Sequence, residues 1–230
     1  MASGDFRLRV IFRKAERLRW LSHLEVTRTL ERGVRRAALP YAVTQGFNPH
    51  MRIAFGPALP VGTGGERETF DVWLTRYVPA GKALEMLRGA LPAGLGPVDA
   101  VYVPASEPAL SAGVHIGVYD VAVEGREVSA ELVQAALELI CSAGTLEVEH
   151  RRKTKVFDLA RSLPKEPRAR DSNGGVIVSL AVRMGPEGSL RPEVLLEAAL
   201  SAAHVQGAVT KVTRTDTLAE VEEGVASRPA

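Results

Sequence analysis

The sequence predicts an α+β protein built from two tandem ferredoxin-like (β-α-β-β-α-β) domains. Apolar residues recur with period 2 in some segments and with helical spacing in others, in the order strand, helix, two strands, helix, strand. That order occurs twice, and a segment rich in Pro, Ser and Gly separates the two runs. We therefore expect domains at 1–104 and 114–216, a linker over 105–113, and a flexible tail over 217–230.

The first half opens with a predicted strand over residues 6–13. Its apolar residues alternate with Arg7, Arg9 and Arg13, so we expect one buried face and one wet, cationic face. A helix over 22–38 follows. The later elements of this half are, in order, extended segments at 41–45 and 51–58, a strand at 69–74, a helix at 80–90 and a strand at 98–103.

The second half repeats this order after the linker. Ser129 is a good N-cap for its first helix. The expected elements are, in order, a strand at 114–123, a helix at 129–142, strands at 145–149 and 175–183, a helix at 192–203 and a strand at 208–214. The two halves share this element order without close sequence identity.

The helix over 22–38 has one apolar and one cationic side. Ser22 and Glu25 have the spacing of a capping box, and Pro40 ends the helix. The side opposite the apolar residues carries four arginines, Arg28, Arg32, Arg35 and Arg36. Residues 1–55 hold eleven Lys and Arg against four Asp and Glu, in a chain whose net charge is only +2. This concentration favours a polyanionic partner such as RNA, and the alternative is a solvated surface face.

The loop after this helix offers side chains suited to recognition. Gly46 permits an unusual backbone angle and Pro49 restricts the residue before it, so the loop should hold its side chains in fixed directions. The side chains expected to contact a nucleobase or another planar, polar group are Phe47, Asn48, His50 and Arg52. For Phe47, the alternative is a plug in the hydrophobic core.

A second basic segment lies between the middle strands of the second half. Residues 147–170 hold eight basic and four acidic side chains. A second contact patch for a polyanion is predicted here, at Arg152, Lys153 and Lys155. The alternative is a mobile hairpin that is basic for solubility.

No catalytic constellation stands out in the sequence. His23 at the helix start and His50 in the loop are weak candidates for the general acid and base of RNA cleavage, provided that the loop returns beside the helix. The histidines lack metal-ligand spacing, so no metal site is expected. Cys141 is the single cysteine and lies in an apolar helical stretch, which is typical of a buried structural thiol.

Composition indicates an ordinary globular protein, since 46% of the residues are hydrophobic and 24% are charged. No apolar run approaches the ~20 residues of a membrane span. The first residues lack the apolar core of a signal peptide. We expect a cytoplasmic protein with no membrane partner.

Several motifs together carry a family resemblance. They are Leu21-Ser22-His23-Leu24, Arg28-Thr29-Leu30-Glu31-Arg32, Gly46-Phe47-Asn48-Pro49-His50, Arg52-Ile53-Ala54-Phe55 and Leu59-Pro60-Val61-Gly62. With these motifs the chain resembles the bacterial radical SAM-linked (radical SAM-associated) protein family, a family of unknown function. The likeness covers most of the chain, to about residue 215.

The resemblance implies a partner protein, a radical SAM enzyme of the cobalamin-binding type. The iron–sulfur cluster and SAM are then expected in that partner, with no cofactor in this chain. The single cysteine, Cys141, agrees, since such a cluster is held by several thiolates. The resemblance implies no catalytic residues.

These observations lead to a functional hypothesis with two alternatives. The chain is expected to be a non-catalytic accessory subunit of a radical SAM enzyme that binds RNA, either tRNA or rRNA, through a basic face. The first alternative is a metal-independent endoribonuclease that uses His23 and His50. The second is a pure protein-interaction module for the radical SAM partner.

Overall fold

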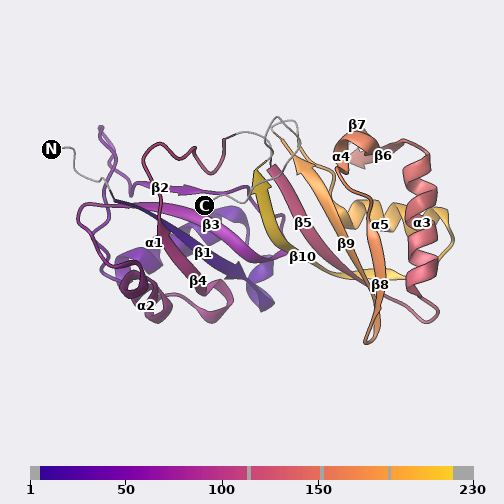
Figure 1. Cartoon of the computed structure of the whole chain (residues 1–230), viewed down its shortest axis with the longest axis horizontal. Coiled ribbons are helices and arrows are strands. Elements are labelled where there is room, and N and C mark those ends of the chain that lie inside the picture. Colours follow the sequence, from indigo (N-terminus) through magenta and orange to yellow (C-terminus); the bar gives the residue numbers. More distant parts are fainter. Residues whose placement is uncertain (1–5, 113–114, 151–152, 186–187, 220–230) are drawn as a thin grey trace. The chain divides into compact units, whose positions relative to one another are not determined.

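The computed structural model describes residues 6–112, 115–150, 153–185 and 188–219. The chain divides between Ala112 and Gly113 into two compact units, called unit 1 and unit 2 below (Figure 1). Each unit combines an antiparallel sheet with helices, which confirms the predicted α+β class. None of the helices in the described ranges combines the length and apolar character that a membrane crossing requires.

Unit 1 contains four strands that pair antiparallel with one another. Its elements are β1 (Phe6–Lys14), the 3-10 helix η1 (Glu16–Trp20), α1 (His23–Arg36), β2 (Ile53–Phe55), β3 (Gly64–Leu74), α2 (Ala80–Ala90), the 3-10 helix η2 (Ala93–Leu95) and β4 (Pro97–Tyr102). The strands lie in the order β4-β1-β3-β2, so β1 and β3 are central. The loop between α1 and β2 therefore leads to an outer position next to β3.

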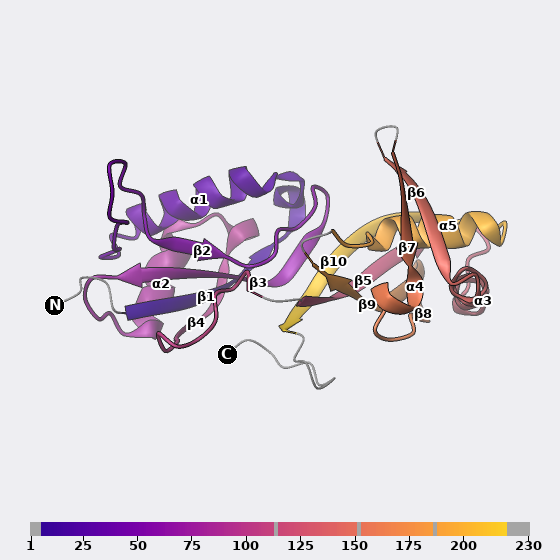
Figure 2. The same ribbon diagram turned by 90° about the horizontal axis from the view of Figure 1, so that it is seen from above.

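The core of unit 1 lies between this sheet and its helices. Leu8 and Val10 on β1 are fully buried in one cluster with side chains of α1 and α2, and Figure 2 shows α1 lying over the strands. A β-carbon on Gly33 of α1 would lie 2.3 Å from Cδ2 of Leu91, just beyond α2, so the Leu91 side chain packs closely against Gly33 and would have to move for any larger residue there. The apolar side of β1 and the apolar side of α1 thus face each other, as their periodicities predict.

The capping box predicted at the start of α1 is confirmed. The hydroxyl of Ser22 accepts from the backbone N–H of Glu25 at 3.4 Å, and the Glu25 carboxylate accepts from the Ser22 N–H at 2.8 Å. The helix ends at Arg36, two residues before the predicted end, and Ala38 has a positive φ of 51°. This start fixes the position of every later residue on the helix surface.

The carboxylate of Glu25 makes the stability of the fold depend on pH. The Ser22 hydroxyl donates to the carboxylate at 2.7 Å, and this hydrogen bond with that from the Ser22 N–H holds the pKa of Glu25 below its ordinary value. A carboxylate whose pKa is lower in the folded state stabilises the fold at pH values above its unfolded-state pKa. This stabilisation is lost as pH falls through the folded-state pKa. We expect Glu25→Gln to have a lower Tm than the unsubstituted chain at pH 7, with the difference shrinking as pH falls below about 4.3 and vanishing once pH is below the lower folded-state pKa of Glu25. Thermal melts across pH check this, and a pH-independent difference would contradict it.

Unit 2 contains four strands that pair antiparallel with one another, and a separate hairpin. Its elements are β5 (His115–Glu124), α3 (Ala130–Ser142), β6 (Thr145–His150), β7 (Lys153–Asp158), α4 (Leu159–Ser162), β8 (Arg168–Ser172), β9 (Gly175–Met184), α5 (Pro192–Ala202) and β10 (Ala208–Ala219). The sheet order is β10-β5-β9-β8, and β6 pairs only with β7 among the described strands. The β6–β7 hairpin projects from this unit (Figure 2).

Two sequence predictions for unit 2 are corrected. Residues 145–149 were predicted as the strand before 175–183, but β8 takes that place in the sheet. The strand β8 escaped prediction because its sequence, Arg-Ala-Arg-Asp-Ser, has one apolar residue and therefore no alternation signal. The tail predicted from residue 217 begins inside β10, which ends at Ala219, and 220–230 lie outside the described residues.

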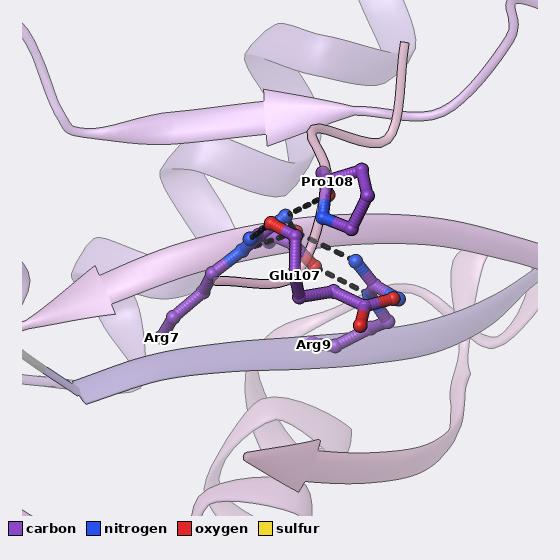
Figure 3. Close-up of polar contacts among 5 residues, drawn as sticks. Arg7, Arg9, Glu107 and Pro108 are labelled. Carbon is purple, nitrogen blue, oxygen red and sulfur yellow. Dashed lines mark hydrogen bonds and ion pairs between the residues drawn. The ribbon is translucent and has the colours of Figure 1, made fainter. Parts of the chain in front are cut away.

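The predicted wet, cationic face of β1 is wrong for two of its three arginines, since Arg7 and Arg9 are buried and Arg13 alone is exposed. Both guanidiniums pair with Asp71 on β3, which is 0% exposed, at N–O distances of 2.6 and 2.9 Å. Arg7 also donates to the backbone oxygens of Glu107 and Pro108, at 2.6 and 2.9 Å (Figure 3). The segment predicted as a linker is therefore held against the sheet by hydrogen bonds from β1, which a local pattern does not show.

Candidate nucleic-acid interface

The arginine stripe of α1 (Arg28, Arg32, Arg35 and Arg36) is exposed along its length. Arg35 lies 3.7 Å from Glu31, and Arg36 donates to the backbone oxygen of Ala90 at 2.6 Å, so these two also serve the fold. Among the described residues, Arg32 donates only to the hydroxyl of Thr29, and Arg28 makes no hydrogen bond or ion pair. Arg28 and Arg32 are therefore the stripe members with most donor capacity for a ligand.

The Phe47 loop, residues 44–50, forms the tip of a hairpin after α1. The Thr44 N–H donates to the His50 oxygen at 2.8 Å, and the His50 N–H donates to the Thr44 hydroxyl at 3.1 Å. Gly46 has a φ of 138°, in the region that favours glycine. Phe47 is fully exposed, and Asn48 beside it is exposed too.

The exposure of Phe47 rules out its alternative interpretation as a core plug. An exposed phenyl ring leaves apolar surface in contact with water. Burying such surface against a partner is favourable by about 25 cal/mol per Å². A loop held in shape by hydrogen bonds that presents such a ring is typical of a contact surface. Phe47 is thus available for stacking on a planar group.

Arg52 leaves this loop and lies over an indole ring. Its Cζ is 4.6 Å from the ring centroid of Trp73 on β3, and the Cζ of Arg7 is 5.3 Å from the same ring. Trp73 was not predicted to belong to the site. The alternation of Asp71 and Trp73 with buried Val72 could have placed both on one side of β3.

The structure does not bring the arginine stripe and Arg52 onto one face of the sheet. Val26 and Leu30 of α1 pack on the side of Leu8, so α1 covers that side and its arginines point away from the sheet. Arg52 lies over Trp73, which pairs in register with Arg7 and shares the opposite side. A polyanion could meet both sites only by passing around the sheet.

The predicted patch in unit 2 is described in part. Arg152 lies outside the described residues, and Lys153 is the first residue of β7. Lys155 is exposed, and its Nζ lies 4.8 Å from the ring centroid of Phe157. Whether this patch binds a polyanion stays a prediction.

His23 and His50 are not brought together. The His23 ring centroid lies 5.8 Å from that of Phe55, and His23 lines a cavity of about 30 Å³ with Lys14 and Glu68. His50 is not among the lining residues of this cavity. It precedes Phe55 by five residues of largely extended chain, at about 3.3 Å per residue. The paired acid–base hypothesis therefore lacks the shared cleft that it needs.

The same cavity contains two buried charged residues that were not predicted. Lys14 and Glu68 are each at least nine-tenths buried. Lys14 continues the apolar side of β1 after Val10 and Phe12, and this alternation was the available signal. At about the volume of one water molecule, the cavity leaves no room for a nucleotide.

A family model identifies the chain's relatives. The family described as "Uncharacterized protein conserved in bacteria (DUF2344)" matches residues 7–192. The chain belongs to this family. The matched range of this DUF2344 member includes the arginine stripe, the Phe47 loop and Arg52.

Comparison with other proteins adds little about this DUF2344 chain. No curated protein matches it. One matching solved chain comes from a "Crystal Structure of a Cbf5-Nop10-Gar1 Complex", with 14% sequence identity and a TM-score of 0.48. The match covers 93% of this chain and 49% of that one, so this chain spans about half the length of the solved chain.

The described residues contain no group of three His, Cys, Asp or Glu side chains placed to hold a metal ion. Cys141 lies partly buried on α3. Burial raises the pKa of its thiol, and the nearby charge of Glu166 raises it further. The thiol is therefore protonated at neutral pH and a poor nucleophile or metal ligand.

Proposed function

We propose that this DUF2344 chain is a non-catalytic accessory subunit of a radical SAM enzyme and binds RNA, either tRNA or rRNA. The observation that carries the proposal is the fully exposed ring of Phe47, on a hydrogen-bonded loop of the unit that also carries the arginine stripe. Exposed arginines suit phosphates, and an exposed ring suits stacking on bases. RNA offers both groups together.

The radical SAM partner rests on the family resemblance and on cysteine chemistry. Cys141 is the single cysteine of the sequence, and a radical SAM cluster needs several thiolates. A separate protein would then supply the cluster. Affinity purification from a bacterium that encodes this chain should recover a radical SAM protein with iron and sulfide, and repeated recovery without one would contradict this part of the proposal.

We also infer that each unit is a ferredoxin-like domain. Supporting this, β1-α1-β2-β3-α2-β4 with strand order β4-β1-β3-β2 has the element order of that plait. The series β5-α3-β8-β9-α5-β10 with order β10-β5-β9-β8 repeats it, with the β6–β7 hairpin inserted before β8. An experimental structure with a different strand order in either unit would contradict the inference.

A salt titration tests RNA binding. Phosphate contacts release counterions, so log K should fall linearly with log salt, by about 0.7 for each contact to a single strand. Filter binding of total tRNA and rRNA fragments to the whole chain should show this slope. Absence of binding at low salt, or binding indifferent to salt, would overturn the proposal.

A protein-interaction module is the second candidate, and exposed apolar side chains favour it. Trp20 and Val61 are each more than half exposed, and the Trp20 ring lies beside Gly62. Such side chains at one site are typical of a protein contact. Co-purification of the partner that survives nuclease treatment, from a chain that fails the RNA titration, would favour this candidate.

Phe47→Ala separates ligand contact from fold stability. We expect RNA affinity to fall by about 1–3 kcal/mol, the range for loss of one base–aromatic stack. Thermal stability should change little, because the ring is fully exposed. Filter binding and a thermal melt on the same preparation check both.

Pro49→Ala is the matched loop variant. Pro49 is exposed and should act by stiffening the loop, so its replacement should lower affinity less than Phe47→Ala does. The reverse order of effects would mean that Phe47 is not the contact.

A further inference from the structure

We propose that Phe47 and Arg52 together form a site for unpaired nucleotides, with Arg52 on a phosphate and Phe47 stacked on a base. This inference rests on the proposed RNA binding and narrows it to single-stranded segments. The arginine stripe alone could meet phosphates of a duplex or of a single strand equally well.

Arg52 is held in place for an oxyanion. Its guanidinium lies over the Trp73 ring, and its backbone oxygen accepts from the Trp73 N–H at 3.1 Å, so both ends of the residue are fixed against β3. The side chain is exposed, and no described residue forms a hydrogen bond or ion pair with the guanidinium. A stacked guanidinium keeps its in-plane N–H donors for a phosphate and loses less rotamer freedom on binding.

The charges around Trp73 favour an anion. Arg7 reaches the same ring from β1, while Arg52 comes from the chain leading into β2, so cations approach Trp73 from both neighbouring strands. Asp71 is the acid nearest along β3, and its carboxylate is fully buried and paired with Arg7 and Arg9. Asp71 and Glu107 offset the charges of Arg7 and Arg9, so the positive charge left at Trp73 for a ligand is that of Arg52, and no exposed acid lies beside Trp73 on β3.

The short loop between Phe47 and Arg52 limits the distance between their side chains. Arg52 is the fifth residue after Phe47, with four residues between them, and five residues of chain span at most about 18 Å. One RNA segment could thus contact both side chains. In a duplex, the base faces are stacked on one another and are closed to Phe47, whereas unpaired bases can be splayed out onto an aromatic ring.

Fluorescence anisotropy with the whole chain tests the inference. The probes are a short labelled RNA oligonucleotide of mixed sequence and the same oligonucleotide annealed to its complement. We expect the single strand to bind about tenfold more tightly, or more, at equal salt. Phe47→Ala should remove this preference by weakening only single-strand binding.

Arg52→Gln tests the phosphate contact. The salt slope for the single strand should fall by about 0.7, the value for one lost phosphate contact. Arg76→Gln, which removes another exposed arginine of unit 1, should leave the slope unchanged. If Arg52→Gln lowers thermal stability, Arg52→Lys is used as the test variant instead. Lysine keeps the positive charge but lacks the planar guanidinium that donates two parallel hydrogen bonds. Arg52→Lys should therefore weaken single-strand binding and leave the salt slope unchanged.

The outcomes distinguish this site from RNA binding in general. Equal affinity for the single strand and the duplex, or a preference that survives Phe47→Ala, overturns the inference and leaves RNA binding intact. An unchanged slope in Arg52→Gln overturns the role of Arg52. Failure of both probes to bind at low salt overturns the proposed function itself.

Discussion

Replacing Asp71 by Asn is expected to lower the free energy of unfolding by about 3–5 kcal/mol, the range for breaking a buried ion pair from one side. Its carboxylate accepts from Nε of Arg7 at 2.8 Å and from Nε of Arg9 at 2.9 Å. Asp71 is fully buried, and both guanidiniums are at least nine-tenths buried. An amide there offers one acceptor oxygen, carries no charge and turns N–H donors toward two cations.

The shared carboxylate explains why this effect should be large. Each buried guanidinium loses its hydration on folding, and only hydrogen bonds and ion pairs with fixed protein groups compensate for that loss. Glu107 lies 3.4 Å from Arg9 and is the more exposed acid, so it is a weaker partner than Asp71. Without Asp71, two positive charges would face each other inside the sheet.

Glu66→Gln is the matched control for Asp71→Asn. It removes one negative charge from the same strand, β3, but at an exposed position. Its effect should stay within about 0.5 kcal/mol, as for most surface substitutions. Urea titrations of both variants check the pair. Similar midpoints for the two would show that the buried cluster contributes little to stability.

The same cluster shows where reading the sequence succeeds and fails. Local alternation correctly placed Leu8 and Val10 in the core, because the strand period depends only on neighbouring residues. The opposite side of β1 was misjudged, since its burial depends on Asp71 and on Glu107, which lie about 60 and 100 residues away in the sequence. No local pattern carries that information.

The candidate site divides in the same way. The arginine stripe follows from helical periodicity after a capping box, and the structure exposes all four arginines as that periodicity requires. Residue types alone did not decide whether Phe47 packs in the core or is exposed for binding, because an aromatic ring is common in both places. The stacking of Arg52 on the Trp73 ring was not predicted, because Trp73 belongs to another strand. Sites assembled across strands become visible only once strand order is known.

Reversing two charges of the stripe, Arg28→Glu with Arg32→Glu, is expected to lower RNA affinity by about 100-fold or more at low salt. Each exposed arginine could make a charge-assisted contact worth about 1.5–3 kcal/mol, and each reversal adds repulsion. The salt slope for a single strand should fall by about 1.4, the value for two phosphate contacts. Neither side chain holds another element in place, so thermal stability should be kept.

A second double variant separates local contact from overall charge. Lys82→Glu with Arg126→Glu changes the net charge by the same amount at two exposed positions outside the stripe. If RNA meets the stripe, only the Arg28 and Arg32 variant should lose affinity and slope. Equal losses in both variants would mean that RNA responds to net charge alone. Loss of partner co-purification after nuclease treatment, with RNA binding unchanged, would instead assign the stripe to an acidic protein surface.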